Sequence, residues 1–144
     1  MKQTMILAGL IAVLLVASST FAQGSGGDAS LFPGFSPDPY TLSYTAGGPT
    51  SASIYGASCR GNIASTPDHV IYLGGFDYLK MAVTSASDTT LVVYSESDGV
   101  WFCADDSEGL NPVLSGTWTP GNYFVYVGSF SGNPSYTLSM TEFR

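Results

Sequence analysis

The sequence predicts an all-β fold, an antiparallel β-sandwich of jelly-roll type, and three observations support this prediction. Short runs rich in β-branched and aromatic residues are separated by glycine, proline and aspartate, which favour turns. The last run, 136–143, alternates Tyr136, Leu138 and Met140 with threonine and serine, as in a strand with one buried face. No segment after residue 22 keeps a helical period over several turns. Several short strands within about a hundred residues are typical of a sandwich.

The expected strands follow one another through residues 40–144, and turn residues end each of them. Pro67 and Asp68 form a turn before 69–74, because proline fixes φ and aspartate bonds its own backbone. Asp98 and Gly99 favour a tight hairpin between two further strands. The expected strands are 40–45, 51–57 (a weak candidate), 69–74, 76–85, 89–96, 100–104, 112–119, 121–130 and 136–143.

Residues 1–22 have the features of a signal peptide. Lys2 precedes an apolar run from Met5 to Ala17, and the small residues Thr20 and Ala22 favour cleavage before Gln23. The run is shorter than the roughly 20 apolar residues that a membrane span needs. We therefore expect a secreted or periplasmic protein with no stable membrane insertion after cleavage. An uncleaved N-terminal anchor is the alternative.

The segment 23–39 is rich in glycine, serine and proline and shows no period. This composition is typical of flexible connections. We expect residues 23–39 to be a flexible lead-in outside the core, and residues 40–144 to form the single sandwich domain.

The acidic composition excludes nucleic acid as a partner. The chain has 11 acidic and 4 basic residues and a formal charge of −7, which becomes −8 without Lys2. Such a charge repels phosphate backbones and anionic lipid surfaces. Cations are the small partners that it favours.

Cys59 and Cys103 are the two cysteines, and an even number in an exported chain predicts one disulfide. Closing a loop of about 45 residues in this way stabilises the fold by about 4 kcal/mol in the chain-entropy model. Two buried thiols are the alternative. A zinc site with four protein ligands is poorly supported, because the chain has one histidine besides these cysteines.

The loop after residue 104 gathers carboxylates in a chain that has few charges. Asp105, Asp106, Glu108 and Asn111 offer oxygen ligands, and Asp88 or Asp98 from neighbouring turns could complete a shell. Calcium prefers six to eight such oxygens, so we predict a calcium site at Asp88, Asp105, Asp106, Glu108 and Asn111. No EF-hand spacing is present. The alternative is a solvated turn in which Asp106 and Ser107 bond nearby amides.

No catalytic residue is predicted. Adjacent Asp105 and Asp106 lie in an open loop, whereas paired acid–base chemistry needs one carboxylate in an apolar pocket. His69 is the lone histidine and no G-x-S-x-G motif accompanies it. We expect His69 at a turn or sheet edge, bonded to Asp68 or to backbone.

The strand 121–130 is apolar on both faces from Tyr123 onward. One face should meet the core. The other is either an exposed aromatic strip for a glycan or peptide, or is covered by the edge of the second sheet or by the N-terminal segment. We expect Trp101 to pack near the disulfide.

The chain resembles the bacterial pre-peptidase C-terminal domain in a series of motifs between residues 88 and 140. The series comprises an aspartate, a strand ending in tyrosine, a glycine turn, a loop with two aspartates, a Gly-x-Tyr-x-Val-x-Val strand and a closing Tyr-x-Leu. These fall on Asp88, 91–94, Gly99, Asp105-Asp106-Ser107 with Gly109, 121–127 and 136–138.

The resemblance implies a small, non-catalytic β-sandwich of secreted bacterial proteins, often appended to peptidases, with calcium stiffening related modules. We therefore expect an exported accessory or binding module, not an enzyme, whose ligand is an unidentified protein or glycan. A carbohydrate-binding protein or a structural envelope-associated protein is the alternative. The cysteine pair is not part of the family pattern.

Overall fold

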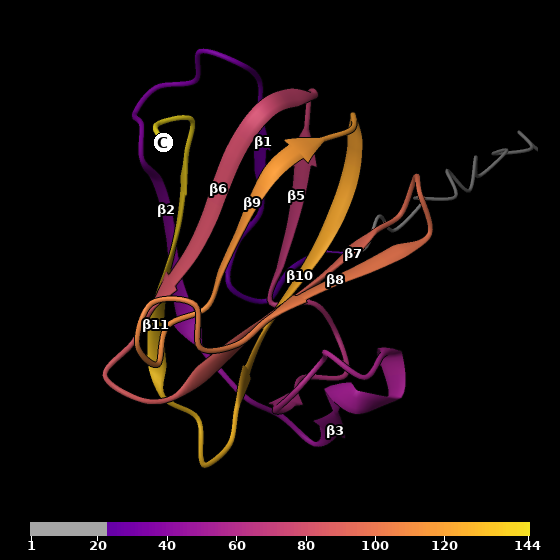
Figure 1. The fold of residues 1–144 in the computed structure, drawn as a ribbon, viewed down its shortest axis with the longest axis vertical. Coiled ribbons are helices and arrows are strands. Elements are labelled where there is room, and N and C mark those ends of the chain that lie inside the picture. The colour runs from indigo at the N-terminus through magenta and orange to yellow at the C-terminus, as the bar shows by residue number, and fades with distance from the viewer. Residues whose placement is uncertain (1–22) are drawn as a thin grey trace, which may run out of the picture.

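Two β-sheets pack face to face in the computed structural model, which describes residues 23–144 (Figure 1). The smaller sheet has four strands in the order β2-β11-β6-β9, and all its pairs are antiparallel. Its strands are β2 (Tyr40–Thr45), β6 (Phe76–Thr84), β9 (Val113–Trp118) and β11 (Ser135–Thr141). The prediction of an antiparallel β-sandwich is confirmed.

The larger sheet has seven strands, and β10 lies at its centre. β10 pairs with β7 along one side, and with β5 and then β4 along the other. β8 continues the sheet beyond β7, and the short β1 and β3 flank β5 and β4. The strands are β1 (Ala29–Leu31), β3 (Thr50–Ser51), β4 (Asn62–Ile63), β5 (His69–Leu73), β7 (Thr89–Ser95), β8 (Val100–Ala104) and β10 (Gly121–Ser129).

The main core fills the space between the sheets and follows the predicted alternation. Leu79, Met81 and Val83 of β6 are buried, and so are the inward residues of β10 and β11. Burying these alternate side chains holds the two layers together, since each is worth about 1.5–3 kcal/mol relative to exposure. The β10 and β11 members are Tyr123, Val125, Val127, Tyr136, Leu138 and Met140.

A second, smaller core lies on the outer face of the larger sheet. A short 3-10 helix (Ala52–Tyr55) and the chain after it cross this face, and Cys59 bonds to Cys103 of β8. Ala52, Cys59, Ile63 and Val92 are buried there, with Trp101 packed against them. The predicted disulfide and the predicted place of Trp101 are therefore confirmed. The expected strand 51–57 is wrong, because this segment caps the sheet as a helical turn.

The N-terminal segment belongs to the fold. β1 pairs in parallel with β5, and Leu31 enters the main core with 3% of its surface exposed. The Gly26 N–H donates to the carbonyl of Asp68 (2.7 Å), and a side chain at Gly26 would meet the His69 ring at 2.6 Å. The expectation that residues 23–39 lie outside the core is wrong for this stretch. Glycine here permits close packing, a role that composition alone does not distinguish from flexibility.

The predicted signal peptide, residues 1–22, lies outside the described residues. Between residues 23 and 144, the structure has no helix with the length and apolar character needed to span a membrane.

Candidate metal centre

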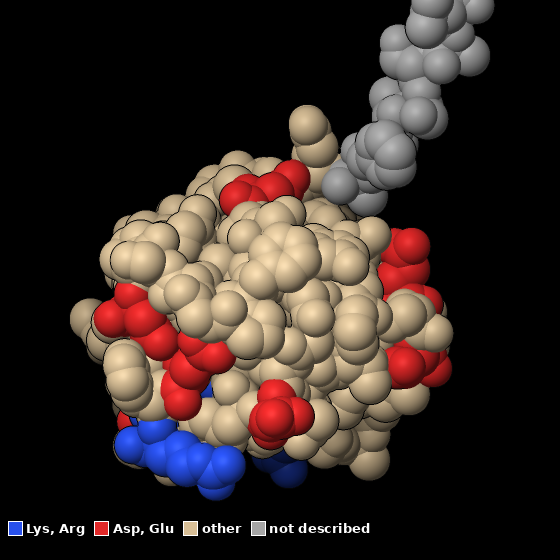
Figure 2. Space-filling view, turned by 90° about the horizontal axis from the view of Figure 1, so that it is seen from above, with Lys and Arg blue, Asp and Glu red and all other residues tan. Residues whose placement is uncertain are grey.

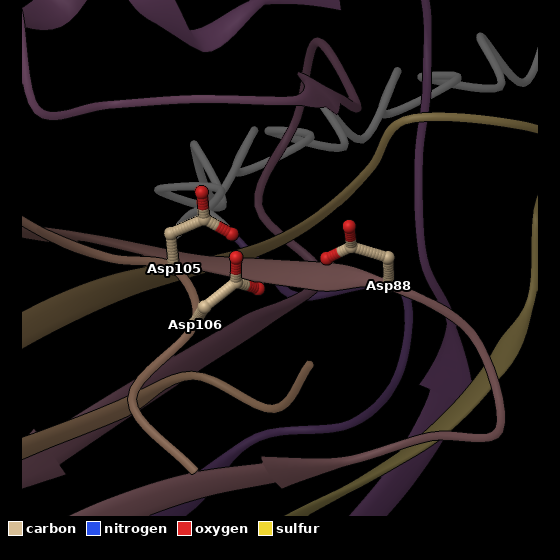
Figure 3. A group of neighbouring side chains, drawn as sticks. All are labelled: Asp88, Asp105 and Asp106. Carbon is tan, nitrogen blue, oxygen red and sulfur yellow. The ribbon is translucent and has the colours of Figure 1, made fainter. Parts of the chain in front are cut away.

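Asp88, Asp105 and Asp106 come together because their strands are antiparallel neighbours. Asp88 immediately precedes β7, and Asp105 and Asp106 immediately follow β8, which pairs with β7 through Leu91 and Ala104. The start of β7 therefore lies beside the end of β8, at the same end of this strand pair. One carboxylate oxygen from each aspartate lies within 4.8 Å of the others, and Figure 3 shows the three carboxylates turned toward one another.

The electrostatics of this aspartate cluster are unfavourable without a cation. Burial raises the pKa of Asp88, and the charge and hydrogen bond of Asp106 raise it further. Burial also raises the pKa of Asp105, with contributions from Asp106 and Asp88 that the nearby Arg60 partly offsets. Like charges this close disfavour joint ionisation. A cation between the three would remove the repulsion.

Two carboxylate oxygens of the cluster are buried without a hydrogen bond. Within residues 23–144, neither Oδ1 of Asp88 nor Oδ1 of Asp105 has a hydrogen-bond partner. Buried polar atoms are nearly always satisfied, so such exceptions need a cause. An ion held between the carboxylates is one cause that fits both atoms.

The other predicted ligands are not among the three converging aspartates. Glu108 and Asn111 form an isolated bridge, in which each backbone N–H donates to the carbonyl of the other (2.9 and 3.1 Å). The Oδ1 of Asn111 accepts a hydrogen bond from the Ser85 N–H at 3.2 Å. Asp98 lies at the opposite end of β7, where its Oδ2 accepts from the hydroxyl of Ser95.

The turn itself is held mainly by backbone and by Ser107. The Ser107 N–H donates to the carbonyl of Asp105 (2.8 Å), and its Oγ accepts from the N–H of Val113 (3.0 Å). Ser107 thus makes the local bonds that a simple turn predicts. These bonds leave the Asp105 and Asp106 carboxylates available for a ligand.

His69 is a buried structural histidine, and both ring nitrogens are engaged. Its Nδ1 lies 2.8 Å from the carbonyl of Gly27 and its Nε2 lies 2.7 Å from the hydroxyl of Tyr136. Because a carbonyl can only accept, Nδ1 carries the proton and Nε2 accepts from Tyr136. Burial lowers the pKa of His69. Neither nitrogen faces a serine hydroxyl.

The sequence interpretation of His69 was right about its backbone bond and wrong about its position. It is fully buried, with no exposed surface, and does not lie at a turn or sheet edge. The missed signal is its spacing: His69 alternates with Ile71 and Leu73, which are both in the core. An alternating strand places all three on one face.

A buried carboxylate beside His69 was also missed. Asp68 is 1% exposed, and its Oδ2 accepts a hydrogen bond from the Val127 N–H at 2.7 Å. Burial raises the pKa of Asp68 to about 6, and the Val127 bond opposes this shift. Through this hydrogen bond, the turn that precedes β5 is joined to β10.

The fold and the cluster define a small, disulfide-bonded β-sandwich with an acidic site at one edge. No protein-family model matches the chain. An uncharacterized protein of Synechococcus elongatus is 33% identical to it over 91 residues. The matched part spans 59% of this chain and 66% of that relative, slightly less than two thirds of the relative's length.

A solved structure also resembles this chain, the pre-peptidase C-terminal domain of a collagenase from Bacillus anthracis. The TM-score is 0.49 at 16% sequence identity, and the match covers 79% of this chain and 94% of that chain. The assignment to the β-sandwich class rests on the strand pairing described above.

Proposed function

We propose that this chain is an exported, non-catalytic β-sandwich module that binds calcium and serves as an accessory or binding domain. One observation carries the proposal. Three carboxylates from two neighbouring strands converge at the sheet edge, and two of their oxygens are buried without a hydrogen bond among residues 23–144.

Calcium fits this donor set better than transition metals do. The cluster offers only carboxylate oxygens, up to six from its three aspartates. Calcium accepts six to eight oxygens in flexible geometry, whereas zinc prefers nitrogen and sulfur ligands. Both cysteines are joined in the disulfide, and the histidine ring is bonded elsewhere.

The arrangement of the ionisable groups supports a role without catalysis. The acidic cluster lies at an open loop, with Asp106 exposed. His69 and Asp68 are buried, and their hydrogen bonds go to Tyr136 and to backbone groups. A hydrolase of the serine type needs a histidine facing a nucleophile, and His69 is committed to structural bonds.

The disulfide supports export, because such bonds persist in oxidising compartments. Together with the predicted signal peptide at 1–22, it favours a secreted or periplasmic location. Its loop also anchors the 3-10 segment on the larger sheet.

Calcium is expected to stabilise the protein. At a free calcium concentration 100 times the Kd, binding to the folded state alone adds about 2.7 kcal/mol. The measurement is thermal unfolding in a chelator and in excess calcium, with magnesium as the ion comparison. Magnesium should stabilise less, because it demands near-octahedral geometry and dehydrates reluctantly.

Two substitutions sharpen this experiment. Asp106→Asn should raise the melting temperature in chelator, because it removes the charge that repels Asp88 and Asp105, and should weaken the calcium response. Asp77→Asn is the matched control, since Asp77 is an exposed aspartate of β6. Equal melting temperatures in chelator and calcium, or an unchanged response in the Asp106 variant, would refute the calcium site.

A further inference from the structure

The outer face of the larger sheet carries a row of aromatic rings that pack against one another. Tyr55 lies on Trp101 with ring centroids 3.8 Å apart and planes 14° from parallel. Trp101 is followed by Tyr94 at 4.8 Å, and Tyr94 by Phe124 at 6.1 Å and 20°. The row crosses β8, β7 and β10, because the register pairs Trp101 with Tyr94 and Tyr94 with Phe124. It ends at Phe124.

A hollow of about 500 Å³ opens beside Phe124, on the side away from Tyr94. We call it the outer hollow; its principal lining residues are Asp28, Val70, Tyr72, Glu96, Asn122 and Phe124. The β5–β10 register explains this lining, since Val70 lies opposite Phe124 and Tyr72 opposite Asn122. The volume is within the range of small-ligand sites.

The outer hollow is acidic and its lining contains no lysine or arginine. The Asp28 carboxylate is held in position, because its Oδ1 accepts hydrogen bonds from the N–H groups of Gly24 (2.8 Å) and Val70 (2.9 Å). Glu96 is an exposed carboxylate just after β7. These two charges meet no cation within the hollow.

The basic residues of the described chain are placed elsewhere. The charge of Arg60 lowers the pKa of Asp105 at the acidic cluster. Arg144 lies over the Tyr78 ring, and Lys80 is in β6 of the smaller sheet. Figure 2 shows the same imbalance on one face, where acidic side chains are spread over the surface and basic ones gather at one border. The protein's field thus favours a cationic ligand.

We propose that the outer hollow binds an arginine side chain presented by a partner protein. The proposal rests on the proposed role as a binding module and names the chemistry of its partner. A guanidinium group can stack on the Phe124 or Tyr72 ring while it donates to the Glu96 carboxylate, and the Asp28 carboxylate adds to the negative charge of the hollow. Its aliphatic stem packs on Val70, which forms part of the apolar lining.

The ring geometry favours arginine over a neutral sugar. A sugar stacks on a broad, open aromatic face, whereas the Tyr55 and Trp101 rings stack on each other at 3.8 Å and the Tyr94 ring packs against Trp101 at a tilt of 40°. An anionic partner would be repelled by both carboxylates of the hollow. A cationic group can interact both with the carboxylates of the hollow and with the ring surface of Phe124 or Tyr72.

The test is an NMR titration of the folded protein with Nα-acetyl-arginine amide, followed through backbone amide shifts. We expect saturable shifts of the Val70, Tyr72 and Phe124 amides. Nα-acetyl-citrulline amide has nearly the same shape without the charge and should not saturate these amides. Glu96→Gln should weaken the arginine affinity by about threefold to tenfold, as expected for a partly exposed ion pair beside an aromatic ring.

Two further variants complete the design. Asp77→Asn removes one exposed charge outside the hollow and should leave the affinity unchanged. Phe124→Leu keeps an apolar side chain but removes the ring, and should weaken binding while the amide spectrum stays dispersed.

The proposal is overturned if the amide shifts are scattered over many surface acids, or if Asp77→Asn weakens binding as much as Glu96→Gln. It is overturned, too, if the citrulline amide binds with the same affinity as the arginine amide. It is also overturned if cellobiose, and not the arginine amide, saturates the same amides. The calcium response of the Glu96 variant is measured separately. A failure of arginine binding with an intact calcium response refutes the outer hollow alone.

Discussion

Breaking the Cys59–Cys103 disulfide is expected to lower the free energy of unfolding by about 4 kcal/mol, the largest single effect that the structure predicts. The bonded cysteines are 44 positions apart, so the bridge removes much conformational freedom from the unfolded chain. It also holds the 3-10 segment over Val92 and Trp101. The restriction of the unfolded chain and the anchoring of the 3-10 segment both stabilise the folded protein.

The measurement is denaturant unfolding of the oxidised protein, of the reduced protein and of the double variant Cys59→Ala/Cys103→Ala. Reduced protein and double variant should lose similar stability. Near-ultraviolet circular dichroism should also change in both, because the Tyr55–Trp101 stack depends on the tethered loop. Unfolding midpoints that coincide in all three samples would show that the bridge adds nothing.

Asp68→Asn is expected to gain stability relative to the unmodified protein as the pH rises from about 4 to 7. In the unfolded chain the Asp68 carboxyl titrates near 3.8, and in the folded chain its pKa is about 6. Between these values the folded state binds more protons, so the stability of the unmodified protein falls as the pH rises. The difference corresponds to about 3 kcal/mol once both states are ionised.

Asparagine retains an oxygen that can accept the Val127 N–H, and it does not ionise. Any fixed cost of its amide group is the same at every pH and drops out of the comparison. The measurement is urea unfolding of both proteins across this pH range. A stability difference that stays constant with pH would contradict the buried ionised carboxylate.

His69 contributes a pH dependence of the opposite sign. Its pKa is lowered in the folded state, so the unfolded chain binds the proton more readily, and stability is lost as the pH falls below about 6.5. This effect is present in both proteins. The difference between them therefore reports on Asp68.

Most strands could be predicted from the sequence because their signals are local. The alternation in 136–143 and in the strand around Val83 specifies which residues face the core, and the structure buries them accordingly. The strand 121–130 is apolar on both faces, so its sequence does not specify which face is buried. Turn residues such as Asp98-Gly99 fix the hairpin between β7 and β8. These features depend on neighbours in the chain.

What could not be predicted depends on contacts between distant segments. β1 forms because Ala29 to Leu31 find an open edge at β5, which the glycine-rich composition does not reveal. The segment 51–57 is apolar enough for a strand, yet the disulfide places it on top of the larger sheet. Val92 is buried on the outer face for the same reason.

Part of the proposed acidic site also follows from local strand pairing. Asp88, Asp105 and Asp106 adjoin paired strands, so their meeting follows from the hairpin. The sequence also suggested Glu108 and Asn111, which are near in the chain but bonded to each other through their backbones. Which of these side chains converge depends on loop geometry, which spacing alone does not specify.

We expect the docked N-terminal segment to be needed for stable folding of this protein. A recombinant version that starts at Tyr40, the domain start expected from composition, would lack the Gly27 carbonyl that pairs with His69 and the Asp28 carboxylate that accepts the Val70 amide. It would also uncover the side of β5 that β1 protects. Fusion partners and purification tags are therefore better attached through a spacer ahead of Gly24 than by trimming the chain.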